Sequence, residues 1–305
     1  MNKSFTLIEI LVVIVVIGVL SAFILVGMSS ITSSANIAKS KAFLNSIDNS
    51  LLLARMSQWN FDELTTAKEG QSIRDAWNSN NGTLYTGLDG LEKIISNCPY
   101  GNCLSFDGSS DYVNCGNMGN TTFYRTNFTL SLWIYPMVWG DPNSNCGDKR
   151  AVLLTKGTSN IGEFELNQTN GGSIYLYMND HGTGAAYYFN TIVPTNKWTQ
   201  VVVTYLTSNY NTTGYVNSVA KPSGQLVRID DEASPFKISG NSTNCANGYF
   251  NGSIDDVRIY NQAIPTSQIQ QNYFIGLNNL YKNRGLTQIE YIERLTELKN
   301  NLTQQ

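Results

Sequence analysis

Phe128-Thr-Leu-Ser-Leu-Trp-Ile-Tyr-Pro136 is the stretch that indicates the fold of most of this 305-residue chain. It is rich in aromatic and branched residues and ends at a proline, as β-strands do. Similar short runs lie on both sides of it, separated by turn residues and with no helical pattern between them. Strands at this spacing predict an antiparallel β-sandwich or jelly roll. We assign the other runs to residues 104–113, 151–155, 163–166, 173–178, 198–205, 213–217 and 252–260.

The carboxy-terminal end is predicted to be helical. Pro265 and Ser267 mark the start of the first helix, and Gly285 interrupts the pattern before a second one. This second piece alternates Glu with Lys or Arg, and it could dock on the globular region, pack along an amino-terminal helix or contact a neighbouring subunit. The apolar stripes run through Ile269, Tyr273, Leu277 and Leu280, and then through Ile289, Ile292, Leu295, Leu298 and Leu302.

The amino-terminal end carries an unbroken apolar stretch over residues 5–26, behind Met1-Asn2-Lys3-Ser4. As a helix it would be about 33 Å long, enough for a hydrocarbon core of about 30 Å. No small-residue cleavage site follows it, so we expect it to remain in the mature protein. Lys3 precedes the stretch and the bulk of the chain follows it, which predicts a cytoplasmic amino end.

The same helix is expected to continue beyond the apolar stretch, because apolar residues return at Ile37, Leu44 and Leu51. We therefore predict one helix over residues 5–56, with its transmembrane part at about 5–28. A coiled-coil dimeriser is an alternative, but the heptad pattern is not sustained. The predicted fold class is α+β: a long hydrophobic helix, an antiparallel β-sandwich and a carboxy-terminal amphipathic helix.

The start of the chain resembles a known export and assembly signal. Lys3-Ser-Phe-Thr-Leu-Ile-Glu9, followed by the apolar helix, resembles the class III leader of type IV pilins and of the pseudopilins of type II secretion. The resemblance implies cleavage by a prepilin peptidase between Ser4 and Phe5, methylation of the new amine, and a role for Glu9 in filament assembly. The family usually has Gly at the position of Ser4, and many members have Pro at the position of Val26. An ordinary signal anchor is the alternative.

The β-rich region resembles the laminin-G-like, concanavalin A-type jelly roll over residues 57–275. The resemblance rests on Trp59-Asn-Phe-Asp62, on Lys197-Trp198 with the strand after it, and on the run from Phe250 to Ile264 that contains Ile-Asp-Asp-Val-Arg-Ile-Tyr. Ser218 stands where the family usually has Gly. Members include glycan-binding modules, protein-binding modules and structural domains, so the fold does not fix the function. The implied organisation is a leader at 1–4, a helix at 5–56, the jelly roll at 57–275 and a helical tail at 276–305.

An enzymatic site is not expected. Glu163 and Glu165 would lie on one face of a strand, about 7 Å apart, which is within the range of paired glycosidase carboxylates. The pair has no further acidic motif beside it, so we interpret it as part of a solvated strand face. His181 is the only histidine and lies in a Gly-rich loop, so we expect no Ser-His-Asp, Cys-His or histidine-based metal site.

A structural calcium ion is a candidate cofactor. Asp75, Asn78 and Asn80 lie in one turn-rich segment and offer hard oxygen ligands. Asp255 shares a strand face with Val257 and Ile259, so we expect it to point inward, where a carboxylate needs a partner. The alternative is that Asp255 accepts backbone hydrogen bonds and no ion binds.

The five cysteines all follow the apolar stretch, which suggests two disulfides and one spare thiol in an exported region. If the chain turns back about Ser109, Cys103 lies opposite Cys115 and can pair with it. Cys146 and Cys245 lie in Asn-rich loops and form the second predicted pair. Cys98 is then left over, and a Cys98 to Cys103 bridge is the main competing assignment.

Composition limits the functions that remain. Charged residues make up 14% of the chain and its net charge is −3, so nothing indicates a nucleic-acid partner. We expect a type IV pilin-like filament subunit, held in the inner membrane before assembly and extracellular afterwards. Its expected partners are other pilin subunits, prepilin peptidase, the assembly machinery and a glycan or surface-protein ligand. A minor pseudopilin of a secretion or DNA-uptake machine, and an adhesin carried on a filament, are the alternatives.

Overall fold

The computed structural model of the chain describes residues 52–87, 94–118, 126–141, 149–158, 162–180, 183–227, 234–240 and 248–303. The chain divides into two compact units, Met1–Leu53 and Ala54–Gln305, and we call the second unit the head. The predicted long helix, including Phe5 and Glu9, lies outside the described residues apart from its last few positions. None of the helices that are described has both the length and the apolar character required to cross a bilayer.

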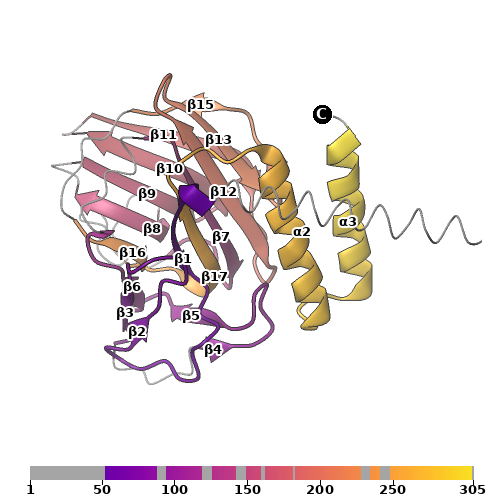
Figure 1. The fold of residues 1–305 in the computed structure, drawn as a ribbon, viewed down its shortest axis with the longest axis horizontal. Helices are drawn as coiled ribbons and strands as arrows, with labels where there is room; N and C mark the ends of the chain where they lie inside the picture. The colour runs from indigo at the N-terminus through magenta and orange to yellow at the C-terminus, as the bar shows by residue number, and fades with distance from the viewer. Residues whose placement is uncertain are drawn as a thin grey trace, which may run out of the picture. The chain divides into compact units, whose positions relative to one another are not determined.

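The head is a sandwich of two antiparallel sheets (Figure 1). Sheet A has the order β14 (Val219–Ala220), β13 (Asn211–Val216), β12 (Thr199–Leu206), β7 (Phe128–Pro136), β17 (Asn251–Tyr260), β5 (Cys103–Asp107) and β4 (Ile94–Ile95), with β1 (Arg55–Trp59) paired to β17 and β15 (Gly224–Gln225) paired to β13. Sheet B has the order β11 (Thr183–Ile192), β10 (Ser173–Asp180), β9 (Gly162–Gln168), β8 (Ala151–Thr158), β16 (Phe236–Ser239), β6 (Tyr112–Asn114), β3 (Gly82–Tyr85) and β2 (Ser72–Ile73). A short 3-10 helix, η1 (Leu52–Ala54), precedes β1.

The main core lies between the two sheets. In β7, Phe128, Leu130, Leu132 and Ile134 belong to this core, whereas Trp133 belongs to a second one. This alternation follows from the two-residue period of a strand. Because β7 is covered on both faces, its sequence reads as a nearly continuous apolar run rather than a strict alternation.

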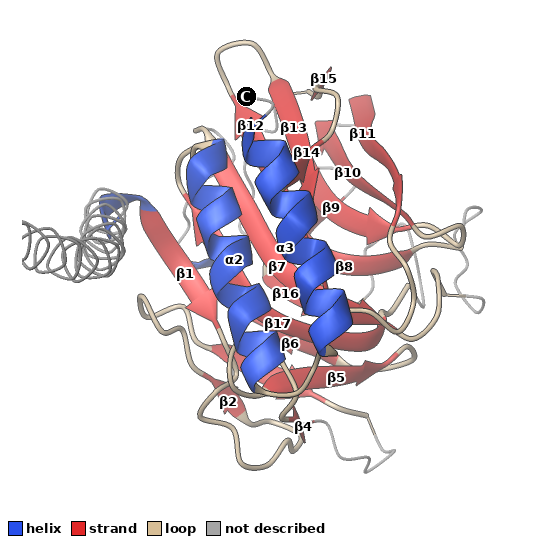
Figure 2. Ribbon diagram, turned by 90° about the vertical axis from the view of Figure 1, so that its right-hand side faces the viewer, coloured by secondary structure: helices blue, strands red, loops and turns tan. Residues whose placement is uncertain are grey.

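The second core lies on the outer face of sheet A, beneath α2 (Thr266–Lys282) and α3 (Gln288–Thr303) (Figure 2). The indole of Trp133 stacks on the ring of Tyr273 at a centroid distance of 5.5 Å. Gly276 makes this approach possible, since a Cβ there would come within 2.4 Å of Trp133. Burying each such aromatic ring contributes about 2 to 3 kcal/mol.

Helix α2 confirms the predicted first stripe, because all four of its members are buried: Ile269, Tyr273, Leu277 and Leu280. Of the alternatives for the last helix, the structure shows docking on the head. The second stripe is partly wrong, because Ile289 and Ile292 are exposed while Arg294 is buried. The predicted boundary between residues 275 and 276 lies inside α2.

The predicted hairpin around Ser109 is wrong. Strand β5 pairs with β17 and β4 in sheet A, whereas β6 pairs with β3 and β16 in sheet B. The turn therefore carries the chain from one sheet to the other. Oδ1 of Asp107 accepts N–H bonds from Ser109 and Ser110 at 2.8 and 3.0 Å. Burial alone would raise the pKa of Asp107, but the Ser109 hydroxyl and these N–H groups hold it well below its usual range.

Other elements differ in extent from the prediction. Strand β1 begins at Arg55, so strand structure starts before the predicted end of the long helix at residue 56. Strands β11 and β16 were not predicted, although β11 extends sheet B beside β10 and β16 joins β8 to β6. The remaining predicted strands are present, with ends that shift by a few residues.

Candidate ligand-binding pocket

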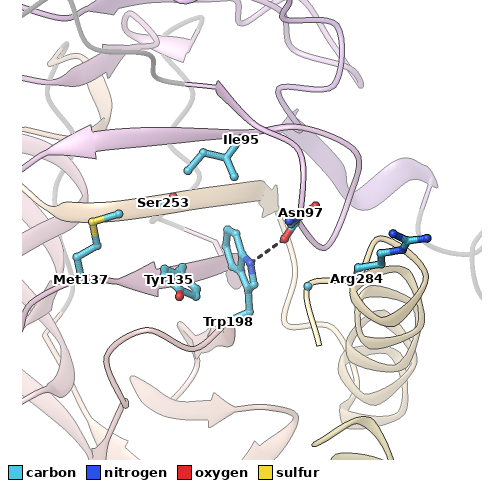
Figure 3. Close-up of a pocket in the computed structure, with 8 residues that line it drawn as sticks. Ile95, Asn97, Tyr135, Met137, Trp198, Ser253 and Arg284 are labelled. Atoms are coloured by element: carbon cyan, nitrogen blue, oxygen red, sulfur yellow. Dashed lines mark hydrogen bonds between the residues drawn. The ribbon is translucent and has the colours of Figure 1, made fainter. Parts of the chain in front are cut away.

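A pocket of about 330 Å³ opens beside the turn between α2 and α3 (Figure 3). Its floor belongs to the outer face of sheet A, and its walls come from the segment around β4 and from the helical turn. The residues that line it are Ile95, Asn97, Tyr135, Met137, Trp198, Ser253, Arg284 and Gly285.

Sheet A positions the floor of the pocket. Tyr135 of β7 pairs with Ser253 of β17, and both alternate with core residues, so their side chains face away from sheet B. Trp198 directly precedes β12, whose first residue pairs with Ile134. The rings of Tyr135 and Trp198 therefore meet at a centroid distance of 5.6 Å.

Trp198 is held at its side chain and at its backbone. Its indole Nε1 donates a hydrogen bond to the carbonyl oxygen of Asn97 at 3.1 Å, which is the dashed line in Figure 3. Its own carbonyl oxygen accepts a hydrogen bond from Nη1 of Arg294 at 2.7 Å, and Arg294 also pairs with Glu290 on α3. The loop thus fixes the buried ring of Trp198, and the last helix fixes its backbone.

The wall formed by residues 95–97 is held by a disulfide. Cys98 and Cys103 are bonded, with their Cα atoms 5.9 Å apart. Nδ2 of Asn283 in the helical turn donates to the carbonyl oxygen of Cys98 at 3.1 Å. At Gly285 a Cβ would lie 2.9 Å from the Asn97 carbonyl oxygen, so the absence of a side chain lets the turn approach the wall.

The polar groups of the pocket are few. Ser253 is 1% exposed, and its hydroxyl has no hydrogen-bond partner among the described residues. In Figure 3 the guanidinium group of Arg284 points away from the ring of Trp198. Rings, aliphatic side chains and a small number of polar groups are the usual lining of a small-ligand site.

An exposed apolar surface continues from the pocket, and we call it the aromatic rim. It consists of Met137, Val138 and Trp139 after β7 and of Ile192 on β11, all between 39% and 63% exposed. Nε1 of Trp139 donates to the Val193 carbonyl oxygen at 2.8 Å. Gly172 lies against this ring, since a Cβ there would be 2.8 Å from Trp139 and 3.0 Å from Ile192. The Trp139 ring is therefore exposed but fixed in orientation.

Glu165, one of the predicted pair of carboxylates, does not lie on a solvated face. Glu165 is fully buried, and its Oε2 lies 3.3 Å from Nη2 of Arg150 and accepts a bond from Asn167. Glu163 lies on the same strand, but its side chain is not among those described, and His181 lies outside the described residues.

The candidate calcium ligands around Asp75 are used by the protein itself. Oδ1 of Asp75 accepts the backbone N–H groups of Gln58, Trp77 and Asn78 at 2.9 to 3.1 Å, and Oδ2 accepts that of Asn80 at 3.2 Å. These four bonds engage both oxygens of the carboxylate and join the turn to β1. A calcium ion at Asp75 would therefore compete with backbone donors that the protein already supplies.

Asp255 does not point into the main core, contrary to the prediction. The pairing of β17 with β7 shifts between Asp255 and Arg258, and Asp256 has a φ of 52°. This bulge inserts one residue, so Asp255 faces the Trp133 side of the sheet while Val257 faces the core. Its Oδ2 accepts the Tyr100 N–H at 2.8 Å, and its Oδ1 has no partner among the described residues.

The electrostatics of Asp255 follow from this burial. Loss of solvent, and next the carboxylate of Asp256, raise the pKa of Asp255 well above its usual range. Asp256 is itself paired with Arg258 at 2.9 Å. No group of three or more His, Cys, Asp or Glu side chains in the described parts of the chain is arranged to hold a metal ion.

The disulfide pairing differs from the predicted one. Cys103 is bonded to Cys98, which was the competing assignment, and Cys115 is a buried free thiol whose pKa is raised by burial. Cys103 and Cys115 flank a crossover between sheets rather than a hairpin, so they do not face each other. Cys146 and Cys245 lie outside the described residues.

Sequence reasoning did not find the pocket. Tyr135 and Trp198 were identified only as strand residues, and Met137, Ser253 and Arg284 were not singled out. A usable signal was present, because Tyr135 alternates with the core residue Ile134 and an aromatic residue there must be covered by something outside the sandwich. The sequence did not show which distant segments would surround it.

Comparison with known families agrees with this architecture. A sequence model of the concanavalin A-like lectin/glucanases superfamily, of laminin-G type, matches residues 107–270. The chain belongs to this superfamily. A model of the prokaryotic N-terminal methylation motif, which is the type IV pilin leader, matches residues 1–25. No curated protein sequence matches the chain at a significant level.

Solved structures share the fold of this laminin-G-like head. Domain 4 of AbnA, an extracellular arabinanase of Geobacillus stearothermophilus solved with arabinotriose, is 18% identical with a TM-score of 0.54, and the match covers 72% of this chain and 98% of that one. The binding domain of Paraclostridial Mosquitocidal Protein 1 is 17% identical with a TM-score of 0.55, and the match covers 75% and 53%. The receptor-binding domain of a botulinum neurotoxin of mosaic serotype C/D is 17% identical with a TM-score of 0.50, covering 73% and 51%. This chain thus spans nearly all of the first structure and about half of the other two. At such identities the likeness concerns the fold alone.

Proposed function

We propose that this protein is a type IV pilin-like filament subunit that displays its laminin-G-like head outside the cell for surface contact or adhesion. The observation that carries the proposal is the presence, in one chain, of the N-terminal methylation motif at residues 1–25 and the superfamily match at 107–270. The first supplies a signal for membrane storage and filament assembly. The second supplies a fold that is used for binding in many proteins.

Processing is the first step of this function. A prepilin peptidase would cut between Ser4 and Phe5, and the new amine of Phe5 would be methylated. Before assembly the apolar stretch would hold the subunit in the inner membrane with its amino end in the cytoplasm. Afterwards the subunit would be part of an extracellular filament, in contact with other pilin subunits and with the assembly machinery.

Assembly would depend on Glu9. A carboxylate within an apolar helix is costly unless it is paired or protonated. The amine of Phe5 on a neighbouring subunit is a suitable partner in a core of packed helices. A slipped register would leave both charges unpaired at a cost of several kcal/mol, so the pair would also set the axial position of each subunit.

We propose a binding role for the head rather than a catalytic one. The burial of Glu165 and its pairing with Arg150 support this, because a general acid or nucleophile must reach its substrate. The adhesin alternative gains support from the aromatic rim, since exposed apolar clusters of this kind mark interaction surfaces. A minor pseudopilin of a secretion or DNA-uptake machine remains the alternative within the same architecture, and it would be scarce in filaments rather than their main component.

The mass of the chain extracted from membranes tests this proposal. We expect a mature form that begins at Phe5 and carries one extra methyl group, and only the full-length form in cells that lack the prepilin peptidase. Ser4→Gly should raise the cleaved fraction or leave it unchanged, because Gly is the usual residue at this position in the family. A chain that stays full length in peptidase-positive cells, or that is cut elsewhere, would contradict the proposal.

A further inference from the structure

Strand β11 lies at one edge of sheet B, and among the described residues it pairs with β10 only (Figure 1). Every second residue of an antiparallel strand directs its backbone N–H and C=O away from the neighbouring strand. No described residue outside β10 makes a backbone–backbone hydrogen bond with β11. Gly184, which has no side chain, is exposed. The backbone of this edge is therefore open to another strand.

Other edges of the two sheets are short or covered. Sheet A ends in β14 and β4 and carries β15 at its margin, and sheet B ends in β2 on its other side; each of these strands has two residues. Strand β1 also lies at an edge of sheet A, but the Asp75 carboxylate accepts the Gln58 N–H, and the Ala76 N–H bonds to the Gln58 carbonyl oxygen. Short or covered edge strands prevent pairing with another chain. Strand β11 has ten residues and no such cover among the described residues.

The sequence of β11 also lacks the residues that discourage pairing. Thr-Gly-Ala-Ala-Tyr-Tyr-Phe-Asn-Thr-Ile contains no charged residue and no proline, and both kinds of residue blunt edge strands. The pairing with β10 changes register after Tyr188, and Asn190 has a φ of 50°, so the regular part of the edge is residues 183–188. This part is about 20 Å long. It carries no charge that would repel a second copy of itself.

A second copy of the same strand fits this edge. Two identical antiparallel strands are related by a two-fold axis, and directly opposite residues lie on the same face. With Ala186 opposite Ala186, Tyr188 of each copy lies opposite Gly184 of the other, and all three residues are exposed. The glycine leaves room for the ring, which makes this a favourable cross-strand pair. The ring of Tyr177 lies beside Gly184, so the incoming Tyr188 would pack against it.

We propose that β11 pairs antiparallel with β11 of a second copy of this chain, which joins sheet B of one head to sheet B of the other. The regular part contributes six residues from each copy, so the interface is at the low end of the usual sizes, where complexes are weak and transient. We therefore expect a reversible dimer with a dissociation constant on the order of 10 μM.

The contact would act between filaments rather than along one. Subunits of a single filament are related by one repeated head-to-tail step, whereas two identical antiparallel strands need a two-fold axis. Strand β11 would therefore link the heads of two adjacent filaments, and many weak links along their length would hold the filaments together. This consequence rests on the proposed function, whereas the pairing itself depends on residues of the head alone.

The experiment uses the full chain in lipid nanodiscs at one chain per disc, which keeps the apolar stretches of different chains apart. Sedimentation velocity over a range of concentrations measures dimerisation of the heads. Ala186→Lys and Ala186→Glu each place two like charges opposite one another, so each should raise the dissociation constant by about threefold to tenfold. An equal mixture of the two variants places opposite charges together, and it should dimerise at least as tightly as the wild type.

The matched control is Ile289→Lys, which adds the same charge at an exposed position on α3 and should dimerise like the wild type. A second measurement decides the result if melting curves show that the charge variants do not fold. Ala186→Cys should give a disulfide-linked dimer on oxidation, because directly opposite Cβ atoms lie about 4.5 to 5.5 Å apart. The wild type, with its own five cysteines, should give no such dimer.

Four results would overturn the inference: the wild type stays monomeric at about 100 μM, it forms assemblies larger than a dimer, the mixture of charge variants dimerises no better than either variant alone, or Ile289→Lys weakens the dimer as much as Ala186→Lys. In each case normal cleavage before Phe5 would leave the proposed filament function standing. Loss of cleavage with intact dimerisation would remove the filament function and leave the pairing of β11.

Discussion

At the scale of single residues, Asp75 shows how one buried carboxylate can organise a loop through backbone hydrogen bonds. It accepts four backbone N–H groups, three from its own turn and one from Gln58 in β1. The oxygen-rich sequence around it predicted a calcium site because the same side chains serve both purposes. The difference lies in the direction of the backbone N–H groups, which a list of residue types does not contain.

The melting temperature of the purified chain should therefore not respond to calcium. We expect the same midpoint with added calcium and with a chelator, because an ion would have to displace hydrogen bonds that already engage both oxygens of Asp75. Magnesium at the same concentration controls for ionic strength. A midpoint that rises with calcium and not with magnesium would show that an ion binds the native state.

Asp255 provides a second prediction at this scale. Its pKa in the folded protein is raised by burial and by Asp256, above the unfolded value of about 3.9. As the pH rises above about 4, Asp255 loses its proton in the unfolded state while it keeps it in the folded state. The stability of the protein therefore falls with rising pH until the pH passes the folded pKa of Asp255. Asp255→Asn removes this loss and keeps an oxygen for the Tyr100 N–H.

We expect the free energy of unfolding of Asp255→Asn to rise relative to that of the wild type as the pH is raised from about 4 to about 7.5. The gain should be at most about 1.4 kcal/mol for each pH unit that separates the folded from the unfolded pKa of Asp255. Chemical denaturation at the two pH values measures the difference. An exposed carboxylate, Glu63, supplies the control, because Glu63→Gln should show no comparable trend. An Asp255→Asn difference that does not change with pH would contradict the raised pKa.

At the scale of elements, the segment between β4 and β5 is the structure that links the pocket to the helices. The Cys98 to Cys103 disulfide closes it, and Asn97 and Cys98 offer carbonyl oxygens to Trp198 and Asn283. Replacing both cysteines by serine should destabilise the head by about 2 kcal/mol, as expected for a short closed loop. Denaturation of the oxidised chain measures this loss.

Peptide mapping without reduction tests the pairing behind that prediction. A peptide that links Cys98 to Cys103 is expected, and Cys115→Ala should leave this link in place because Cys115 is not bonded to either residue. A link between Cys103 and Cys115 would contradict the structure.

The same elements show what sequence patterns can predict. Central strands such as β7, and the apolar stripe of α2, were predictable because burial follows the local period of the chain. The turn after Asp107 was misread because a Gly-Ser-Ser segment fits both a hairpin and a crossover between sheets. The bulge at Asp256 reversed the predicted direction of Asp255, since one extra residue shifts every later side chain. The pocket could not be predicted, because Tyr135, Trp198 and Ser253 meet only through long-range pairing.

At the scale of the whole molecule, the chain joins an N-terminal methylation motif to a laminin-G-like head. The head keeps two separate cores, one between its sheets and one beneath α2 and α3. The helices cover much of the outer face of sheet A (Figure 2). The pocket opens beside their turn. This arrangement suits a binding module that is carried by other parts of the chain.

The content of sheared filaments tests the filament function most directly. Cells that express tagged wild-type chain, Glu9→Val or Glu63→Val beside the untagged chain would be compared for the tagged subunit in purified filaments and in membranes. We expect the wild type and Glu63→Val in the filaments. Glu9→Val should be present in membranes at the normal level and cleaved before Phe5. In filaments its amount should fall at least about tenfold, because the amine of the neighbouring subunit is left unpaired. Incorporation of Glu9→Val at the wild-type level, or absence of the wild-type chain from filaments, would contradict the function proposed for this protein.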